Sequence, residues 1–283
     1  MEPIQTHEVA SADGTRIVGG VHGHGPPLVL VPGGPADGET GWLALVPCLS
    51  ERFTCYTINT RGRGPSDDHP DHSRARIVED IVAFVESIGD DVLLFGHSAG
   101  GTHALEAAAN TAVVRALALY EPTLMELAEP DRRADFDDAF VRARAAVADG
   151  RAADGAQIFL EELALANDDE LALLEEVGAA HQMAPLVPLV LDEAAQSGPP
   201  QLTDLALLDE LTMPVLLLHG ARTHPFYKHV ARQVADRLAE CRLREVPGLG
   251  HLGPEIAPEP VTDELRWLLT AVASRGTEEQ ALT

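Results

Sequence analysis

Short, uninterrupted apolar segments alternate with segments of helical periodicity over most of this chain. Three of the apolar segments, 27–31, 91–95 and 114–120, are rich in Leu, Val, Phe and Ala and lack the polar alternation of a half-exposed strand. Such strands are typical of a parallel sheet that is buried on both faces. The segments between them, 74–88 and 99–110, have helical spacing and would provide the cover. The pattern therefore predicts an α/β fold with a mostly parallel sheet and helices on both faces.

The same alternation extends toward both ends of the chain. Residues 6–31 alternate apolar and polar side chains around two turn signals, which predicts an antiparallel hairpin before the strand at 27–31. The remaining expected elements are helices at 40–50, 226–240 and 261–273 and strands at 53–58, 215–218 and 242–246. Together they predict a sheet of the eight-stranded type.

A helical insertion interrupts this rhythm. Residues 124–208 are rich in Ala, Leu and Glu with helical periodicity, and no segment in them resembles a strand. Prolines at 185, 188, 199 and 200 are expected to break helices there. We expect a core made of residues 1–123 and 209–283 and a helical cap made of residues 124–208.

The charge balance restricts the partners. The chain has 45 Asp and Glu against 20 Lys and Arg, so its formal net charge is −25. This argues against nucleic acid and anionic membranes as partners, because both require clustered cations. The absence of a long apolar run or a signal peptide, and three cysteines without metal-ligand spacing, favour a cytoplasmic protein. Both a monomer and a homodimer remain open.

The most informative motif is Gly96-His97-Ser98-Ala99-Gly100. It lies between the buried strand that ends at Phe95 and an Ala-rich helix. A serine on a sharp strand-to-helix turn needs small neighbours, and the turn exposes its hydroxyl to a ligand beside the positive end of the helix dipole. The context predicts that Ser98 is a nucleophile, and the alternative is a plain glycine-rich turn.

With four further segments, this motif resembles the pattern of the α/β-hydrolase family over nearly the whole chain. The segments are Val31–Pro35 (VPGGP), Arg61–Ser66 (RGRGPS), Tyr120–Pro122 (YEP) and Gly248–His251 (GLGH). Pro32 stands where the family often has histidine. The resemblance implies a cofactor-independent hydrolase that uses a nucleophile, a base and an acid, with the cap in the family's usual place. In this pattern Arg61 and Arg63 are expected to be structural.

The resemblance assigns the base and the oxyanion donors. A serine hydroxyl needs a base to remove its proton. His251 follows a strand in a glycine-rich loop, as the family's catalytic histidine does. The backbone amides of Ala99 and Gly34 are expected to hold the oxyanion.

The acid departs from the family's pattern. Its usual position after the seventh strand is occupied by Thr223, and residues 211–235 contain no Asp or Glu. Some relatives place the acid after the sixth strand, where Glu121 stands. We expect Pro122 to hold Glu121 in an extended conformation and Glu121 to orient His251. The alternative is that Glu121 only anchors the cap.

These residues predict a serine hydrolase of a small carboxylic ester, lactone or thioester with an apolar acyl part. Further candidates for substrate contact are Gly33, His97, Met125, Met183 and Thr223, although His97 is also expected as a packed residue behind the nucleophile. The alternatives are hydrolysis of a carbon–carbon or amide bond, lyase, cyclase or perhydrolase chemistry in the same pocket, and a catalytically silent protein that binds a small molecule. The vacant acid position at Thr223 favours the last of these.

Overall fold

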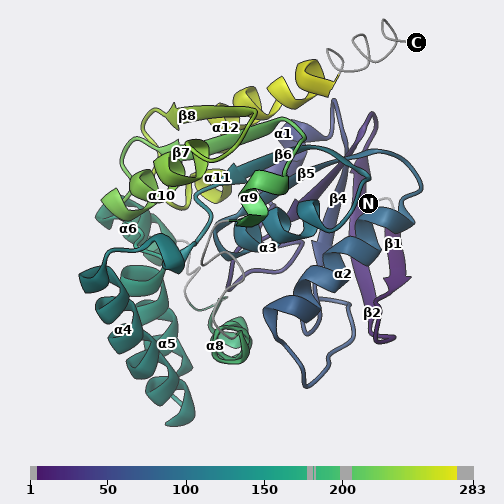
Figure 1. The fold of residues 1–283 in the computed structure, drawn as a ribbon. Helices are drawn as coiled ribbons and strands as arrows, with labels where there is room; N and C mark the ends of the chain where they lie inside the picture. Colours follow the sequence, from purple (N-terminus) through teal and green to yellow (C-terminus); the bar gives the residue numbers. More distant parts are fainter. Residues whose placement is uncertain (1–4, 177–180, 182, 198–205, 273–283) are drawn as a thin grey trace, which may run out of the picture.

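The computed structural model describes residues 5–176, 181, 183–197 and 206–272, and Figure 1 shows their arrangement. In this part of the chain eight strands form one sheet in the order β1-β2-β4-β3-β5-β6-β7-β8. The first two pairs in this order, β1 with β2 and β2 with β4, are antiparallel, and all the others are parallel. The strands are β1 Gln5–Ala10, β2 Arg16–Gly23, β3 Pro27–Val31, β4 Thr54–Asn59, β5 Val92–His97, β6 Val114–Tyr120, β7 Val215–Gly220 and β8 Cys241–Val246. The predicted fold class is confirmed.

Helices cover both faces of the sheet because successive strand residues point to opposite sides. Leu28 and Leu30 of β3 belong to a core cluster with residues of α1 and α12, whereas Val29 and Val31 belong to the cluster formed with α2, α3 and α10. The helices are α1 Leu45–Leu49, α2 Arg74–Ser87, α3 Ser98–Ala109, α10 Pro225–Ala235, α11 Gly253–Ile256 and α12 Pro258–Leu265. This double cover explains why the central strands are apolar throughout.

Some predicted boundaries differ from those in the structure. The helix expected at 40–50 is shorter, because the Asp37 carboxylate accepts hydrogen bonds from the amides of Glu39 and Thr40 and forms a turn before α1. Strand β5 continues two residues beyond the predicted end at Phe95, to His97. The predicted helix at 261–273 begins earlier, at Pro258, and residue 273 lies outside the described residues.

Residues 124–208, which we call the inserted segment, lie between β6 and β7. Its described residues contain no strand. Figure 1 shows α4, α5, α6 and α8 gathered on one side of the molecule. Its elements are η1 Met125–Leu127, α4 Pro130–Ala148, α5 Ala152–Ile158, the π-helical turn η2 Phe159–Leu163, α6 Asp168–Glu176, η3 Ala184–Leu186, α8 Val187–Gln196 and α9 Ala206–Glu210.

The inserted segment has a small core of its own. This cluster consists of Ala139, Ala143, Ala156, Leu163, Ala184, Val187 and Leu191. Pro185 and Pro188 stand in the first turns of η3 and α8, where a missing N–H is tolerated, so each marks a boundary between helical elements. Pro199 and Pro200 lie outside the described residues. No helix in the described ranges is both long and apolar enough to cross a membrane.

Candidate active site

Ser98 occupies a strained position where β5 meets α3. Its φ angle is 55°, in the left-handed region that side chains other than glycine rarely adopt. A Cβ on Gly100 would lie 2.1 Å from the carbonyl oxygen of Pro32, and one on Gly96 would lie 2.6 Å from the carbonyl oxygen of Gly100. The two glycines therefore permit the close backbone approach that the sharp turn needs, as the sequence led us to expect.

The structure brings Ser98, His251 and Glu121 together from the ends of three different strands. Ser98 Oγ lies 3.0 Å from His251 Nε2, and His251 Nδ1 lies 2.7 Å from Glu121 Oε2. His251 follows β8, and Glu121 follows β6. Both side chains are essentially inaccessible to solvent, at 1% and 0% exposure. The imidazole is thus within hydrogen-bond reach of a hydroxyl on one side and a carboxylate on the other.

The conformation of Glu121 differs from the expected one. Its φ angle is 48°, so the prediction that Pro122 holds it extended is wrong. Four hydrogen bonds offset the strain of this left-handed residue. Its amide donates to the Leu218 carbonyl oxygen at 3.0 Å, and its carboxylate accepts from the Gly220 amide at 2.7 Å, from Thr223 Oγ1 at 2.8 Å and from His251 Nδ1. The loop after β7 therefore fixes the direction of a side chain that follows β6.

Thr223 lies beside the carboxylate instead of contacting substrate. It is 8% exposed, and its hydroxyl donates to Glu121 Oε2. The threonine at the family's usual acid position thus supports a carboxylate that arrives from the neighbouring strand end.

Two aromatic rings pack against His251. The Tyr227 ring stacks on the imidazole with centroids 4.2 Å apart and planes inclined by 12°, and the Tyr227 hydroxyl donates to the Ala164 carbonyl oxygen at 3.1 Å. His97 Nε2 lies 2.8 Å from the His251 carbonyl oxygen, which can only accept, so His97 donates there. Burial lowers the His97 pKa, but Glu255 more than offsets this, so that the pKa is raised. Tyr227 was not among the residues predicted from the sequence, where its only signal was its position on the helix after β7.

A carboxylate of the inserted segment holds the loop that carries His251. Glu170 of α6 is buried, and its two oxygens accept from the Leu252 amide at 2.8 Å and the Asn167 amide at 3.0 Å. Burial raises the Glu170 pKa. Leu252 directly follows His251, so α6 contacts the backbone next to the imidazole. No sequence pattern pointed to Glu170.

The two candidate oxyanion donors lie at the start of α3 and in the loop after β3, which meet at Ser98. Ala99 is in the first turn of α3, where amides have no acceptor within the helix. A Cβ on Gly33 would lie 3.1 Å from the Ser98 Cβ, so the loop after β3 passes directly beside the nucleophile. A Cβ on Gly34 would lie 2.8 Å from Val190 Cγ1, which places α8 against the same loop.

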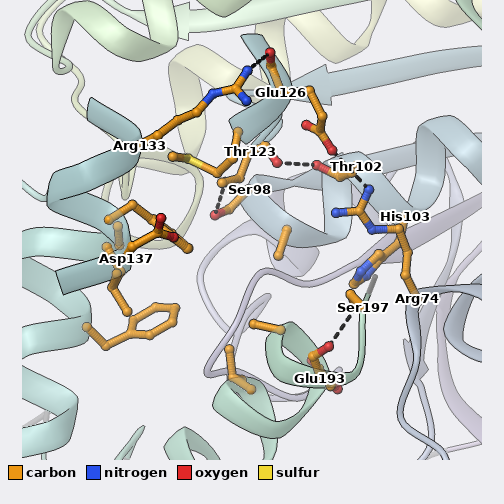
Figure 2. Close-up of a pocket in the computed structure, with 18 residues that line it drawn as sticks. Arg74, Ser98, Thr102, His103, Thr123, Glu126, Arg133, Asp137, Glu193 and Ser197 are labelled. Carbon is orange, nitrogen blue, oxygen red and sulfur yellow. Dashed lines mark hydrogen bonds and ion pairs between the residues drawn. The ribbon is translucent and has the colours of Figure 1, made fainter. Parts of the chain in front are cut away.

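A cavity of about 600 Å³ opens beside Ser98, between α3 and the inserted segment. Figure 2 shows its lining. Its apolar wall includes Met125, Phe136, Phe159, Leu163 and Val190.

Of the residues expected to contact substrate, Met125 lines this cavity, whereas Gly33, His97, Met183 and Thr223 are not among its lining residues. Met183 packs instead against the cluster of Leu160, Ala166, Leu174 and Leu252. His97, Met183 and Thr223 take part in packing. The sequence pattern did not distinguish such packed residues from residues of a pocket wall.

Comparison with known proteins agrees with this architecture. Residues 26–258 match the model of the alpha/beta hydrolase fold family. An alpha/beta hydrolase from Sphaerobacter thermophilus is 26% identical, with a TM-score of 0.75, over 93% of this chain and 100% of that one. The esterase EaEST from Exiguobacterium antarcticum is 20% identical with a TM-score of 0.75, over 92% and 98% of the two chains. A bromoperoxidase from Bacillus anthracis is 19% identical with a TM-score of 0.78, over 94% and 100%. None of the curated proteins matches the chain.

Proposed function

The chain belongs to the alpha/beta hydrolase fold family, and from this premise we propose that it is a serine hydrolase that cleaves a small carboxylic ester, lactone or thioester through an acyl-enzyme. The observation that carries the proposal is the continuous chain of contacts from Ser98 Oγ through His251 to the Glu121 carboxylate. The esterase from Exiguobacterium antarcticum shares the fold. The inserted segment would serve as the cap over the substrate.

The acylation step follows from the geometry. Ser98 Oγ attacks the substrate carbonyl carbon while its proton passes to His251 Nε2, 3.0 Å away. The imidazolium that forms is stabilised by the Glu121 carboxylate at Nδ1. The Ala99 and Gly34 amides would donate to the developing oxyanion. His251 then gives the proton to the leaving alcohol, lactone oxygen or thiol.

Deacylation uses the same groups in reverse order. A water molecule loses a proton to His251 Nε2 as it attacks the acyl carbonyl, and the proton returns to Ser98 Oγ when the acid leaves. The Tyr227 ring, stacked on the imidazole, would keep it aligned through both steps.

The position of Glu121 also weakens the alternative of a silent binding protein. That alternative was supported by the absence of an acid near Thr223, and Glu121 lies 2.7 Å from the imidazole nitrogen that an acid would contact. A protein without catalysis would have no evident need for a buried carboxylate in a strained conformation at this nitrogen.

Labelling with a fluorophosphonate tests the proposal, because this probe reacts with serine hydroxyls that a base activates. We expect stoichiometric labelling of the wild-type protein at Ser98, no labelling of S98A, and hydrolysis of p-nitrophenyl esters by the wild-type protein alone. An unlabelled wild-type protein that leaves every ester in a series of increasing acyl length intact would refute the proposal.

A further inference from the structure

One carboxylate oxygen in the substrate cavity has no partner. The Glu126 side chain is only 4% exposed and lines the cavity beside Ser98. Its Oε1 lies 3.4 Å from Arg74 Nη1. Its Oε2 has no hydrogen-bond partner among the described residues. Buried polar atoms in folded proteins nearly always have one, so this oxygen lacks a donor that a ligand bound in the cavity could supply.

A neutral histidine lines the same cavity. Burial, and then the nearby Arg74 and Arg63 guanidinium groups, lower the pKa of His103 to about 3. The imidazole is therefore uncharged at neutral pH and offers one donor and one acceptor nitrogen. Within the described residues neither ring nitrogen forms a hydrogen bond. Figure 2 shows His103, Arg74 and Glu126 on the same side of the cavity.

The charges around Glu126 restrict the group that it can bind. Arg74 Nη1 lies between Glu126 and the buried Glu106, at 3.4 and 3.1 Å. A substrate carboxylate would face the Glu126 carboxylate, and a substrate ammonium would face the Arg74 guanidinium, so a full charge of either sign meets a like charge here. A hydroxyl meets neither obstacle, because it donates to Glu126 Oε2 and accepts from Arg74 or His103.

We propose that Arg74, His103 and Glu126 form a polar subsite for a hydroxyl group on the substrate, so that this enzyme prefers hydroxylated esters to purely aliphatic ones. This inference rests on the proposed serine hydrolase function and makes its substrate class more specific. Glu126 is a specificity residue here, since it contacts a part of the substrate remote from the reacting carbonyl. The apolar wall of the cavity would hold the carbon chain between the two ends.

Matched esters test the subsite. One series is p-nitrophenyl esters of ω-hydroxy acids with four to ten carbons, each compared with the ester in which a methyl group replaces the hydroxyl. The other is monoacetates of linear diols, compared with alkyl acetates of the same size. We expect the hydroxylated member of at least one pair to have a kcat/KM higher by about tenfold or more, because hydrogen bonds to charged groups are strong.

The variant E126Q shows whether Glu126 provides the preference. Glutamine keeps the shape but replaces one acceptor oxygen with a donor group, so the ratio of kcat/KM values within the best pair should fall toward one. The ratio does not depend on the fraction of folded enzyme. E129Q is the matched control, because the Glu129 side chain is 75% exposed at the start of α4, and it should keep the wild-type ratio.

The outcomes separate the two proposals. Labelling of Ser98 combined with ratios near one in both series would overturn the subsite, while the hydrolase proposal stands. A wild-type ratio that persists in E126Q would also overturn it. Failure of labelling and of all hydrolysis would refute the hydrolase proposal, and the subsite would fall with it.

Discussion

The hydroxyl of Thr223 donates a hydrogen bond to Oε2 of Glu121 across 2.8 Å, and the same oxygen faces His251 Nδ1 at 2.7 Å. The ends of two neighbouring strands therefore both contribute to placing a carboxylate beside His251. The carboxylate follows the end of β6. The donors that fix it come from the last residue of β7, through the Gly220 amide, and from Thr223 in the loop after it. A carboxylate held by three donors has little freedom to leave the imidazole.

Replacing Glu121 by glutamine should lower kcat by about 10⁴-fold, because the neutral amide can neither stabilise the imidazolium nor enforce the productive tautomer. Steady-state kinetics with a p-nitrophenyl ester measure this loss. Glu245→Gln, at a half-exposed carboxylate on β8, serves as the control and should retain activity. A near-wild-type rate for E121Q would assign the orienting role to another group.

Thr223→Val should lower the free energy of unfolding by about 1.5–3 kcal/mol, because the buried Glu121 carboxylate loses one donor while the volume is nearly conserved. Urea denaturation monitored by fluorescence or circular dichroism gives this value. The conservative variant T223S keeps the hydroxyl and should remain close to the wild-type protein. Equal stability of T223V and T223S would contradict the role of this hydrogen bond.

Substitutions of different size separate the contribution of the Tyr227 ring from that of its hydroxyl group. Tyr227→Phe keeps the ring on His251 and removes the hydroxyl, which donates to the Ala164 carbonyl oxygen and lies 3.4 Å from His251 Nε2, so we expect kcat to change by less than about tenfold. Tyr227→Ala removes the stacked ring, and a misplaced imidazole should lower kcat by about 10²-fold. The cavity should also destabilise the fold by about 3–5 kcal/mol. Similar kcat values for both variants would rule out alignment by stacking.

A histidine outside the candidate site makes stability depend on pH. His72 Nδ1 lies 2.8 Å from Asp192 of α8, and Nε2 lies 2.7 Å from Asp68. Burial lowers the His72 pKa, but the two carboxylates more than offset this and raise it above the ordinary value of 6.5. The stabilisation is therefore complete below about pH 6.5 and is lost as the pH rises through the folded-state pKa.

The variant H72Q should accordingly lose more stability at pH 5.5 than at pH 9, relative to the wild-type protein at each pH. Thermal unfolding at the two values measures the difference. H24Q is a suitable control, since His24 is exposed on the turn before β3. A difference between wild type and H72Q that is constant over pH would show that the charged form of His72 contributes nothing.

Local patterns were sufficient for the scaffold. The strand at 114–120 and the turn around Ser98 were predictable because the signals lie within a few neighbouring residues, where apolar runs and glycine positions act directly on the backbone. The choice of His251 as the base followed from the family resemblance. Glu121 followed from the family resemblance and from the lack of acidic residues at 211–235, although its left-handed backbone contradicted the effect expected from Pro122.

What the sequence did not provide are contacts between distant segments. Glu170 accepts a hydrogen bond from the Leu252 amide, which is 82 positions away in the sequence. The Tyr227 ring stacks on His251, and neither residue's neighbouring sequence indicates this contact. The unpartnered oxygen of Glu126 is likewise a property of the folded cavity, because only the surroundings decide whether a glutamate is solvated or buried.

The bond between Glu170 and the Leu252 amide has a consequence for engineering. Exchanging the inserted segment for that of another family member is an obvious route to a new substrate range. Such a graft would delete the acceptor for an amide next to His251, so it would alter the loop that carries His251 together with the pocket. A chimera that retains residues 164–176 with the core should therefore preserve turnover better than one divided at the ends of the segment. The boundaries for recombination then flank α6 and its approach, away from the ends of β6 and β7.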